Sequence, residues 1–183
     1  AEAGASVVHC PESNLKLGSG VCPLPDLLDR GVRVGLGTDG AASNNDLDLL
    51  SEARTAGLLS SGLSAGPGRV AAGDLLRLAT LEGARCLGLG DTTGSLVAGK
   101  WADMCCIDLS SPRSWPVSDI PTTLLYSASA SQVTDTWVAG RHLLADGVLT
   151  YTDEADLLRR CDEWRKRMDS ESRKAEEEPD AKR

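Results

Sequence analysis

Apolar residues in the first part of the chain alternate between short continuous runs and stretches with helical spacing. The runs at 6–9 and 32–36 are typical of buried strands. A polar loop is predicted at 11–20, and apolar periodicity predicts helices at 24–30 and 46–59. Because parallel strands are joined by crossover helices, this segment predicts an α/β layer.

The pattern changes beyond residue 90, where turn residues and short apolar runs replace the helical spacing. Strands are predicted at 102–109 and 133–139. Gly140-Arg141 is interpreted as the two-residue turn of a hairpin that continues into the next apolar run. We therefore expect a small β module at 91–150, distinct from the α/β segment at 1–90.

Two more helices are predicted from apolar periodicity. One covers 75–87, with Asp74 as its N-cap. The other covers 151–170, and its charged residues alternate in sign as on a solvated face. We expect the charged segment 171–183 to be a disordered tail. The apolar face of the second helix consists of Leu157, Leu158, Cys161, Trp164 and Met168.

Composition restricts the classes of partner. The 183 residues include 19 basic and 27 acidic side chains, which give a formal net charge of −8. Affinity for nucleic acid comes largely from Lys and Arg that neutralise phosphates, so we expect no nucleic-acid partner. No apolar stretch approaches the roughly 18 residues of a membrane span, so we expect no membrane association and a cytoplasmic location.

Six cysteines are present, and none belongs to a Cys-x-x-Cys pair. In a chain of this length without a signal-peptide pattern, we interpret them as small buried apolar side chains and not as disulfide partners. The two histidines, His9 and His142, lie far from the adjacent pair Cys105-Cys106. A zinc knuckle is therefore not predicted.

The candidate chemistry is concentrated just after the second predicted strand. The strand at 32–36 leads into a loop at 37–45 that is rich in Gly, Ser and Asn and contains Asp39. Ligands of α/β sheets and barrels bind at the carboxyl ends of the strands, so Asp39 occupies a position suited to a catalytic group. From the local sequence alone, Asp39 is equally well explained as the first residue of an Asp-Gly turn or as a helix cap.

A second loop follows the first predicted strand in the same way. His9 ends that strand, so we expect it to share a rim with Asp39 and to act as a ligand, a proton carrier or a hydrogen-bonded structural side chain. Asn14, Ser43 and Asn44 suit the recognition of a polar heterocycle. Each is equally suited to satisfying its own loop backbone.

Both loops resemble segments of a known family. Residues 6–18 (SVVHCPESNLKLG) and 37–45 (GTDGAASNN) are similar to the seventh and eighth strand segments of the amidohydrolase superfamily. The resemblance is closest to its chlorohydrolase/aminohydrolase branch, especially the 5-methylthioadenosine/S-adenosylhomocysteine deaminases. Residues 94–103 and 138–141 resemble the β-sandwich strands of the same family.

The resemblance implies a metal-dependent hydrolase that acts on a small nucleoside and releases ammonia. Asp39 matches the position that binds one divalent metal ion, usually zinc, and handles a proton of the attacking water. A metal ion of this kind lowers the pKa of its bound water to about 7. Ser43 matches a position that contacts the nucleoside, whereas Asn14 and His9 are weaker candidates for substrate binding. His9 does not match a metal ligand.

The chain also departs from the family pattern. The family's His-x-His and its two further metal-site histidines have no counterpart among the two histidines present. Residues 1–4 also read as the last turn of a helix. We therefore expect the carboxyl-terminal part of such an enzyme: the last two βα units of a TIM-like (β/α)₈ barrel, part of a β-sandwich and a final helix. The chain alone should be inactive. The intact enzyme is expected to be a homo-oligomer.

Three alternatives differ in function. The resemblance also covers guanine deaminases and triazine chlorohydrolases, which share the fold but not the substrate. The loop at 41–45 (AASNN) favours the nucleoside branch. A third alternative is a non-catalytic fragment that docks on a partner chain.

Overall fold

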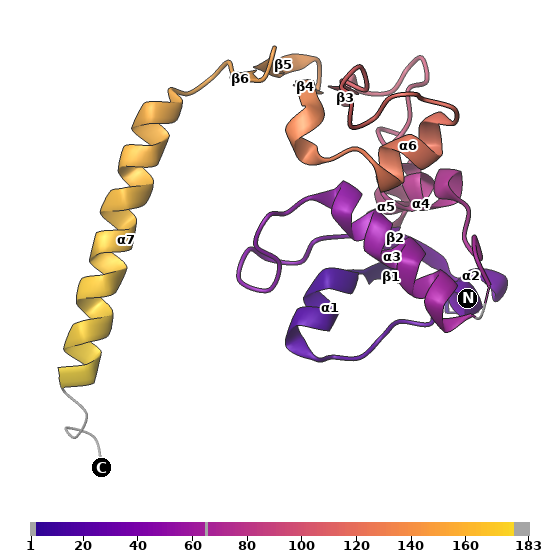
Figure 1. Ribbon diagram of the computed structural model, residues 1–183, viewed down its shortest axis with the longest axis horizontal. Helices are drawn as coiled ribbons and strands as arrows, with labels where there is room; N and C mark the ends of the chain where they lie inside the picture. Colours follow the sequence, from indigo (N-terminus) through magenta and orange to yellow (C-terminus); the bar gives the residue numbers. More distant parts are fainter. Residues whose placement is uncertain (1–2, 65, 178–183) are drawn as a thin grey trace.

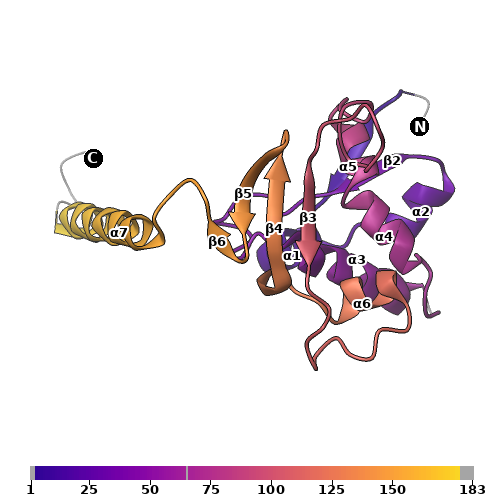
Figure 2. The ribbon, with the colours of Figure 1, turned by 90° about the horizontal axis from the view of Figure 1, so that it is seen from above.

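The computed structural model describes residues 3–64 and 66–177. A mixed α/β layer is followed by a small antiparallel sheet, and a long helix stands apart from both (Figure 1, Figure 2). The α/β layer contains β1 (Ser6–His9), α1 (Pro11–Leu17), α2 (Leu24–Asp29), β2 (Arg33–Leu36), α3 (Leu49–Leu63), α4 (Ala72–Leu78) and α5 (Leu81–Cys86). The remainder contains β3 (Met104–Ile107), α6 (Ile120–Tyr126), a 3₁₀ turn (Ala130–Gln132), β4 (Val133–Val138), β5 (Arg141–Ala145), β6 (Val148–Leu149) and α7 (Glu154–Glu177).

The first two strands form a parallel pair, which confirms the predicted α/β layer. His9 lies opposite Leu36 in the register, so both carboxyl ends reach the same edge. The backbone N–H of Gly37 donates to the carbonyl oxygen of His9 at 3.0 Å and extends the pairing beyond the strand end. The loops that follow β1 and β2 therefore start side by side.

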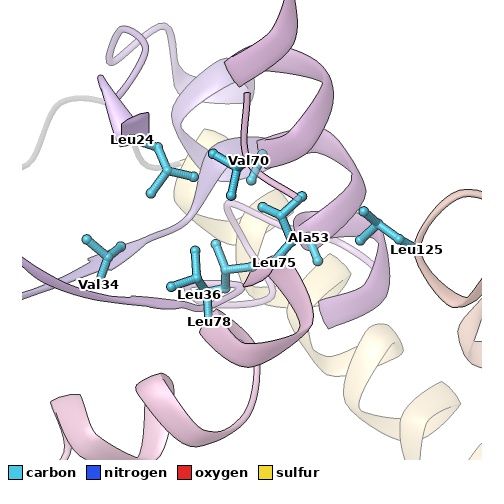
Figure 3. Packing of buried hydrophobic residues seen from close by; sticks show 9 residues of the cluster. Leu24, Val34, Leu36, Ala53, Val70, Leu75, Leu78 and Leu125 are labelled. Carbon is cyan, nitrogen blue, oxygen red and sulfur yellow. The ribbon is translucent and has the colours of Figure 1, made fainter. Parts of the chain in front are cut away.

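The core is aliphatic and covers one side of β2 (Figure 3). Leu75 of α4 and Leu125 of α6 are both completely buried, so α6 contributes to the same core although it lies beyond residue 90. The Nε of Arg54 on α3 donates to the carbonyl oxygen of Leu125 at 2.8 Å and fixes α6 against α3. The other buried members of the cluster are Leu24, Val34, Leu36, Ala53, Ala56, Val70 and Leu78.

One predicted loop and one predicted helix differ from the structure. The stretch predicted as a polar loop at 11–20 contains α1, because Pro11 opens a first turn and Gly18, at φ 67°, ends it in the left-handed conformation. The single helix predicted at 75–87 is two helices, α4 and α5, which Thr80 separates. Asp74 lies in the first turn of α4 and is not its N-cap.

The remaining sequence forms a four-stranded antiparallel sheet in the order β3-β4-β5-β6 (Figure 2). The hairpin between β4 and β5 was predicted one residue too late. Its turn residues are Ala139 at φ 48° and Gly140 at φ 76°, and Arg141 already pairs with Val138. Positive φ at both central positions is typical of a type I′ turn, whose twist matches the flanking strands.

The last helix is longer than predicted. It runs to Glu177, past the expected boundary at 170, while residues 178–183 of the predicted tail lie outside the described residues. Both views show α7 away from the rest of the chain, and its predicted apolar face is exposed, with Trp164 at 58% and Met168 at 64% (Figure 1, Figure 2). Within the described residues, no helix is long and apolar enough to cross a membrane.

All six cysteines lie in the described part of the chain and are free, as predicted. The prediction that they are buried is wrong for Cys105, Cys106 and Cys161. The first two are neighbours on β3, so they point to opposite faces of its sheet. Cys161 lies on the exposed helix α7.

A close backbone approach at Gly35 generates a prediction about stability. A Cβ on Gly35 would lie 2.9 Å from the Cα of Gly83 in α5, closer than non-bonded carbons approach. We expect Gly35→Ala to lower the free energy of unfolding by about 1–3 kcal/mol, because the backbone of α5 must move. Chemical denaturation measures this, with Gly73→Ala as the control because its Cβ meets nothing within 4 Å. Equal stability of the two variants would contradict the predicted clash.

Asp103 generates a prediction about pH. Its carboxylate accepts the N–H of Ala139 at 2.6 Å and the hydroxyl of Thr93 at 2.7 Å, and these hydrogen bonds lower the pKa of Asp103. A lowered folded-state pKa stabilises the fold above the ordinary value of about 3.9, and this contribution is lost as pH falls through the lowered value. The melting temperature of Asp103→Asn should therefore lie below that of the parent at pH 7, and the difference should shrink below about pH 4.

The exposed Asp91 in the preceding turn provides the matched control. Asp91→Asn should leave the melting temperature nearly unchanged at pH 7. A difference between Asp103→Asn and the parent that stays constant from pH 7 to pH 3 would contradict the assignment.

Candidate active site

Asp39 follows β2 by three residues and projects from the edge where both strands end. Its φ of 59° places it in the left-handed region, which Asp tolerates better than most residues. Gly37 permits the close approach of the Asp39 loop to β1, because a Cβ at Gly37 would lie 2.8 Å from Cγ1 of Val8. The Asp39 side chain is exposed in the described chain.

Two serine hydroxyls hold the Asp39 carboxylate. Ser13 Oγ donates to Oδ2 at 2.9 Å, and Ser43 Oγ donates to the same oxygen at 2.8 Å. These hydrogen bonds, with that of Ser43 the larger effect, lower the pKa of Asp39, so it is an oriented anion at neutral pH. Because Ser13 belongs to α1 and follows β1, the two strand ends share one rim, as predicted.

His9 lies beneath this rim and not on it. Its side chain is 3% exposed, and its Nδ1 has no hydrogen-bond partner within the described chain. Burial lowers the pKa of His9, so the imidazole is neutral at pH 7. A buried, neutral imidazole whose Nδ1 lacks a hydrogen-bond partner is a less direct candidate for substrate contact than the sequence suggested.

The polar candidates divide into three kinds. Ser43 also approaches the carbonyl oxygen of Gly40 at 3.1 Å, so its proton is shared while its oxygen can still accept a hydrogen bond. Asn14 is half-buried in α1, and its backbone carbonyl oxygen accepts the N–H of Ser19. Asn44 is buried, and its amide donates to Glu52 and accepts the N–H of Leu47, which supports the structural alternative for this residue.

The sequence interpretation missed a buried carboxylate behind the rim. Glu52 of α3 is completely buried and accepts the N–H of Glu12 at 3.0 Å and the Nδ2 of Asn44 at 2.6 Å. Burial raises the pKa of Glu52. A signal was present, because Glu52 shares the helix face of Leu49 and Ala53, where an apolar residue is expected.

Glu12 and Lys16 connect α1 to its neighbours. Oε1 of Glu12 accepts the hydroxyls of Ser51 at 2.6 Å and Thr55 at 2.7 Å. Lys16 Nζ donates to the carbonyl oxygen of Ala42 at 3.0 Å. Beside Ser43, a cavity of about 220 Å³ is lined by Glu12, Lys16, Ser43, Asn44, Asn45 and Asp46.

The described residues do not form a metal site by themselves. No group of three or more His, Cys, Asp or Glu side chains converges in 3–64 and 66–177. A catalytic zinc ion takes about three protein ligands, and Asp39 offers one oriented anionic oxygen donor. The chemistry available at this rim is therefore that of a single fixed carboxylate, suited to one bond to a cation or to proton transfer.

Comparison with known proteins places this rim in a family. The chain is 46% identical over 157 residues to a 5-methylthioadenosine/S-adenosylhomocysteine deaminase of Moorella thermoacetica, covering 86% of this chain and 37% of that protein. It is similar to a zinc-bound adenosine deaminase of Xanthomonas campestris, with a TM-score of 0.90 and 47% identity over 92% of this chain and 38% of the other. A zinc complex of an atrazine chlorohydrolase from Arthrobacter aurescens matches with a TM-score of 0.81 and 30% identity, covering 87% of this chain and 35% of the other.

These relatives are longer than the chain, which spans less than two-fifths of each. The mixed α/β fold is that of amidohydrolase-superfamily structures, and the amidohydrolase family model matches residues 1–143. This match covers more than half of the chain and includes both strand ends, Asp39 and the antiparallel sheet as far as β5. The chain therefore belongs to the amidohydrolase family.

Proposed function

We propose that this chain is part of a hydrolytic deaminase whose substrate is a purine nucleoside of the 5-methylthioadenosine or S-adenosylhomocysteine type. The observation that supports this most directly is the Asp39 carboxylate, which serines from both strand ends orient at one rim. The identity to a deaminase of that name, 46%, supports the substrate class. The reaction replaces the amino group on the purine carbon by the oxygen of water and releases ammonia.

In this proposal, residues 1–90 are the last two βα units of a (β/α)₈ barrel and residues 91–150 are part of a β-sandwich. The parallel pairing of β1 and β2 supports the first assignment, because strands of such barrels are parallel and carry active sites at their carboxyl ends. The antiparallel order β3-β4-β5-β6 supports the second. The coverage of 38% of the zinc-bound relative is consistent with such a share.

Asp39 has two roles in the proposed reaction. It is one ligand of a divalent metal ion, proposed to be zinc, and a proton carrier between the attacking water and the leaving nitrogen. A bound zinc ion lowers the pKa of its water to about 7. The hydroxyl groups of Ser13 and Ser43 both donate to Oδ2, so neither serine occupies Oδ1.

The substrate contacts proposed from this chain lie beside Asp39. Ser43 is the first. Its hydroxyl group donates its proton in a hydrogen bond to Asp39, so its oxygen can still accept a hydrogen bond from a substrate hydroxyl. Asn14 would contribute its side-chain amide from α1. His9 is the weakest of the three candidates, because its side chain is 3% exposed and its unpartnered Nδ1 is itself buried.

A triazine chlorohydrolase or guanine deaminase activity is less well supported. The atrazine chlorohydrolase shares the fold at 30% identity, whereas the zinc-bound adenosine deaminase reaches 47%. Substrate choice depends on pocket side chains, and this difference in identity favours the nucleoside.

Replacement of Asp39 tests the proposed function. In the intact protein, Asp39→Ala should reduce ammonia release from 5-methylthioadenosine at least about 10²-fold, because both the metal ligand and the proton carrier are lost. Circular dichroism should show that the protein stays folded, since the side chain is exposed, while the loss of the hydrogen bonds from Ser13 and Ser43 lowers the melting temperature only modestly. Undiminished ammonia release with normal metal content would contradict the assignment.

The isolated chain provides a second test. Because the described residues offer only one donor at the rim, the 183-residue chain with added zinc should not release ammonia above background. Co-expression with the complementary amino-terminal region of a relative should restore release. Activity of the chain alone would refute the proposed division of the site.

A further inference from the structure

We propose that Glu52 is a positioning residue for Asp39, acting through the two serines that hold the Asp39 carboxylate. This inference rests on the proposed function of Asp39. Glu52 does not contact Asp39 and lies behind the rim on α3. Its carboxylate instead fixes the two chain segments from which the serines project.

Glu52 accepts two hydrogen bonds, one from α1 and one from the loop that contains Ser43. Oε2 accepts the backbone N–H of Glu12 at 3.0 Å, and Oε1 accepts the side-chain Nδ2 of Asn44 at 2.6 Å. Glu12 directly precedes Ser13 in α1, and Asn44 directly follows Ser43 in the rim loop. One buried carboxylate thus fixes the sequence neighbours of both serines that donate to Oδ2 of Asp39.

These contacts close a ring. Starting from the carboxylate at the rim, hydrogen bonds and peptide bonds join Asp39, Ser13, Glu12, Glu52, Asn44 and Ser43, and then return to Asp39. Asp39 and its loop have no regular secondary structure, so their own backbone does not define the carboxylate orientation. The ring supplies that definition from the rigid helix α3, as a precise functional site requires.

The residue type suits this role. Both partners of Glu52 are donors, the backbone N–H of Glu12 and the side-chain NH₂ of Asn44. A carboxylate has one acceptor oxygen for each of them. A glutamine would turn its own NH₂ toward one of these donors. No Lys or Arg forms an ion pair with Glu52 among the described residues, so the buried carboxyl group is satisfied by hydrogen bonds alone. A buried carboxyl group without a cationic partner is costly and argues for a specific use.

A second set of contacts separates positioning from folding. The Glu12 side chain accepts the hydroxyls of Ser51 and Thr55 on α3, independently of Glu52. Helix α1 therefore remains attached to α3 when the hydrogen bonds that Glu52 accepts are weakened. The near-isosteric Glu52→Gln should leave the chain folded but allow Ser13 and Ser43 to shift relative to Asp39.

The test is the carboxyl ¹³C resonance of Asp39 at pH 7 in the intact protein, assigned by its loss in Asp39→Asn. This resonance responds to hydrogen bonds at the carboxylate, which a general loss of stability does not remove. Glu52→Gln should move it in the same direction as Ser13→Ala/Ser43→Ala, which removes the donors directly. In a double-mutant cycle, Glu52→Gln added to that serine variant should produce no further shift.

The matched control is Glu82→Gln on α5, a carboxylate that Arg85 contacts at 2.7 Å and that, within the described chain, bonds none of the six residues of the ring. It should leave the Asp39 resonance in place. If Glu52→Gln does not fold, Asn44→Ala removes the hydrogen bond from the rim loop to Glu52, together with the one that Asn44 accepts from Leu47. It should give a smaller shift, which should be absent in a Ser43→Ala background. An unmoved resonance in a folded Glu52→Gln or Asn44→Ala protein, or a full shift in the serine background, would overturn the proposal. Because this readout needs no turnover, its failure is distinct from failure of the Asp39→Ala activity test.

Discussion

The proposed site depends on one carboxylate oxygen and the two hydroxyl groups that donate to it. Ser13 and Ser43 come from loops that follow different strands, and both donate to Oδ2 of Asp39. This arrangement exists because β1 and β2 are parallel and end at the same edge. The parallel pair, the rim and the oriented anion are therefore one structural feature, and the proposed chemistry follows from it.

Much of this feature could be predicted from the sequence. The apolar runs at 6–9 and 32–36 and the Gly-rich loop after the second run were sufficient to predict the parallel pair and the position of Asp39. Helix α1 was missed because polar residues fill it and its signals, Pro11 and Gly18, are also typical of loops. Ser13 was missed with it, since nothing in the local sequence indicates which hydroxyl approaches a carboxylate 26 positions away.

Glu52 illustrates a different limit. Its place on the apolar face of a helix marked it as an exception, but its partners lie 40 positions upstream and 8 positions back in a loop without periodicity. A tertiary arrangement of this kind follows from packing and not from local propensity. The three-residue error in the cap of α4 and the single-residue error in the β4–β5 turn have smaller causes, because several neighbouring residues suit the same turn.

The proposed function requires the Asp39 carboxylate to face a metal ion and a substrate at the strand-end rim. The most direct measurement is a crystal structure of the intact protein with zinc and a purine nucleoside. The account predicts that Oδ1 of Asp39 lies at about 2.0–2.2 Å from the ion, while Oδ2 keeps its bonds to Ser13 and Ser43. An ion coordinated without Asp39, or an Asp39 side chain turned away from the bound nucleoside, would contradict it.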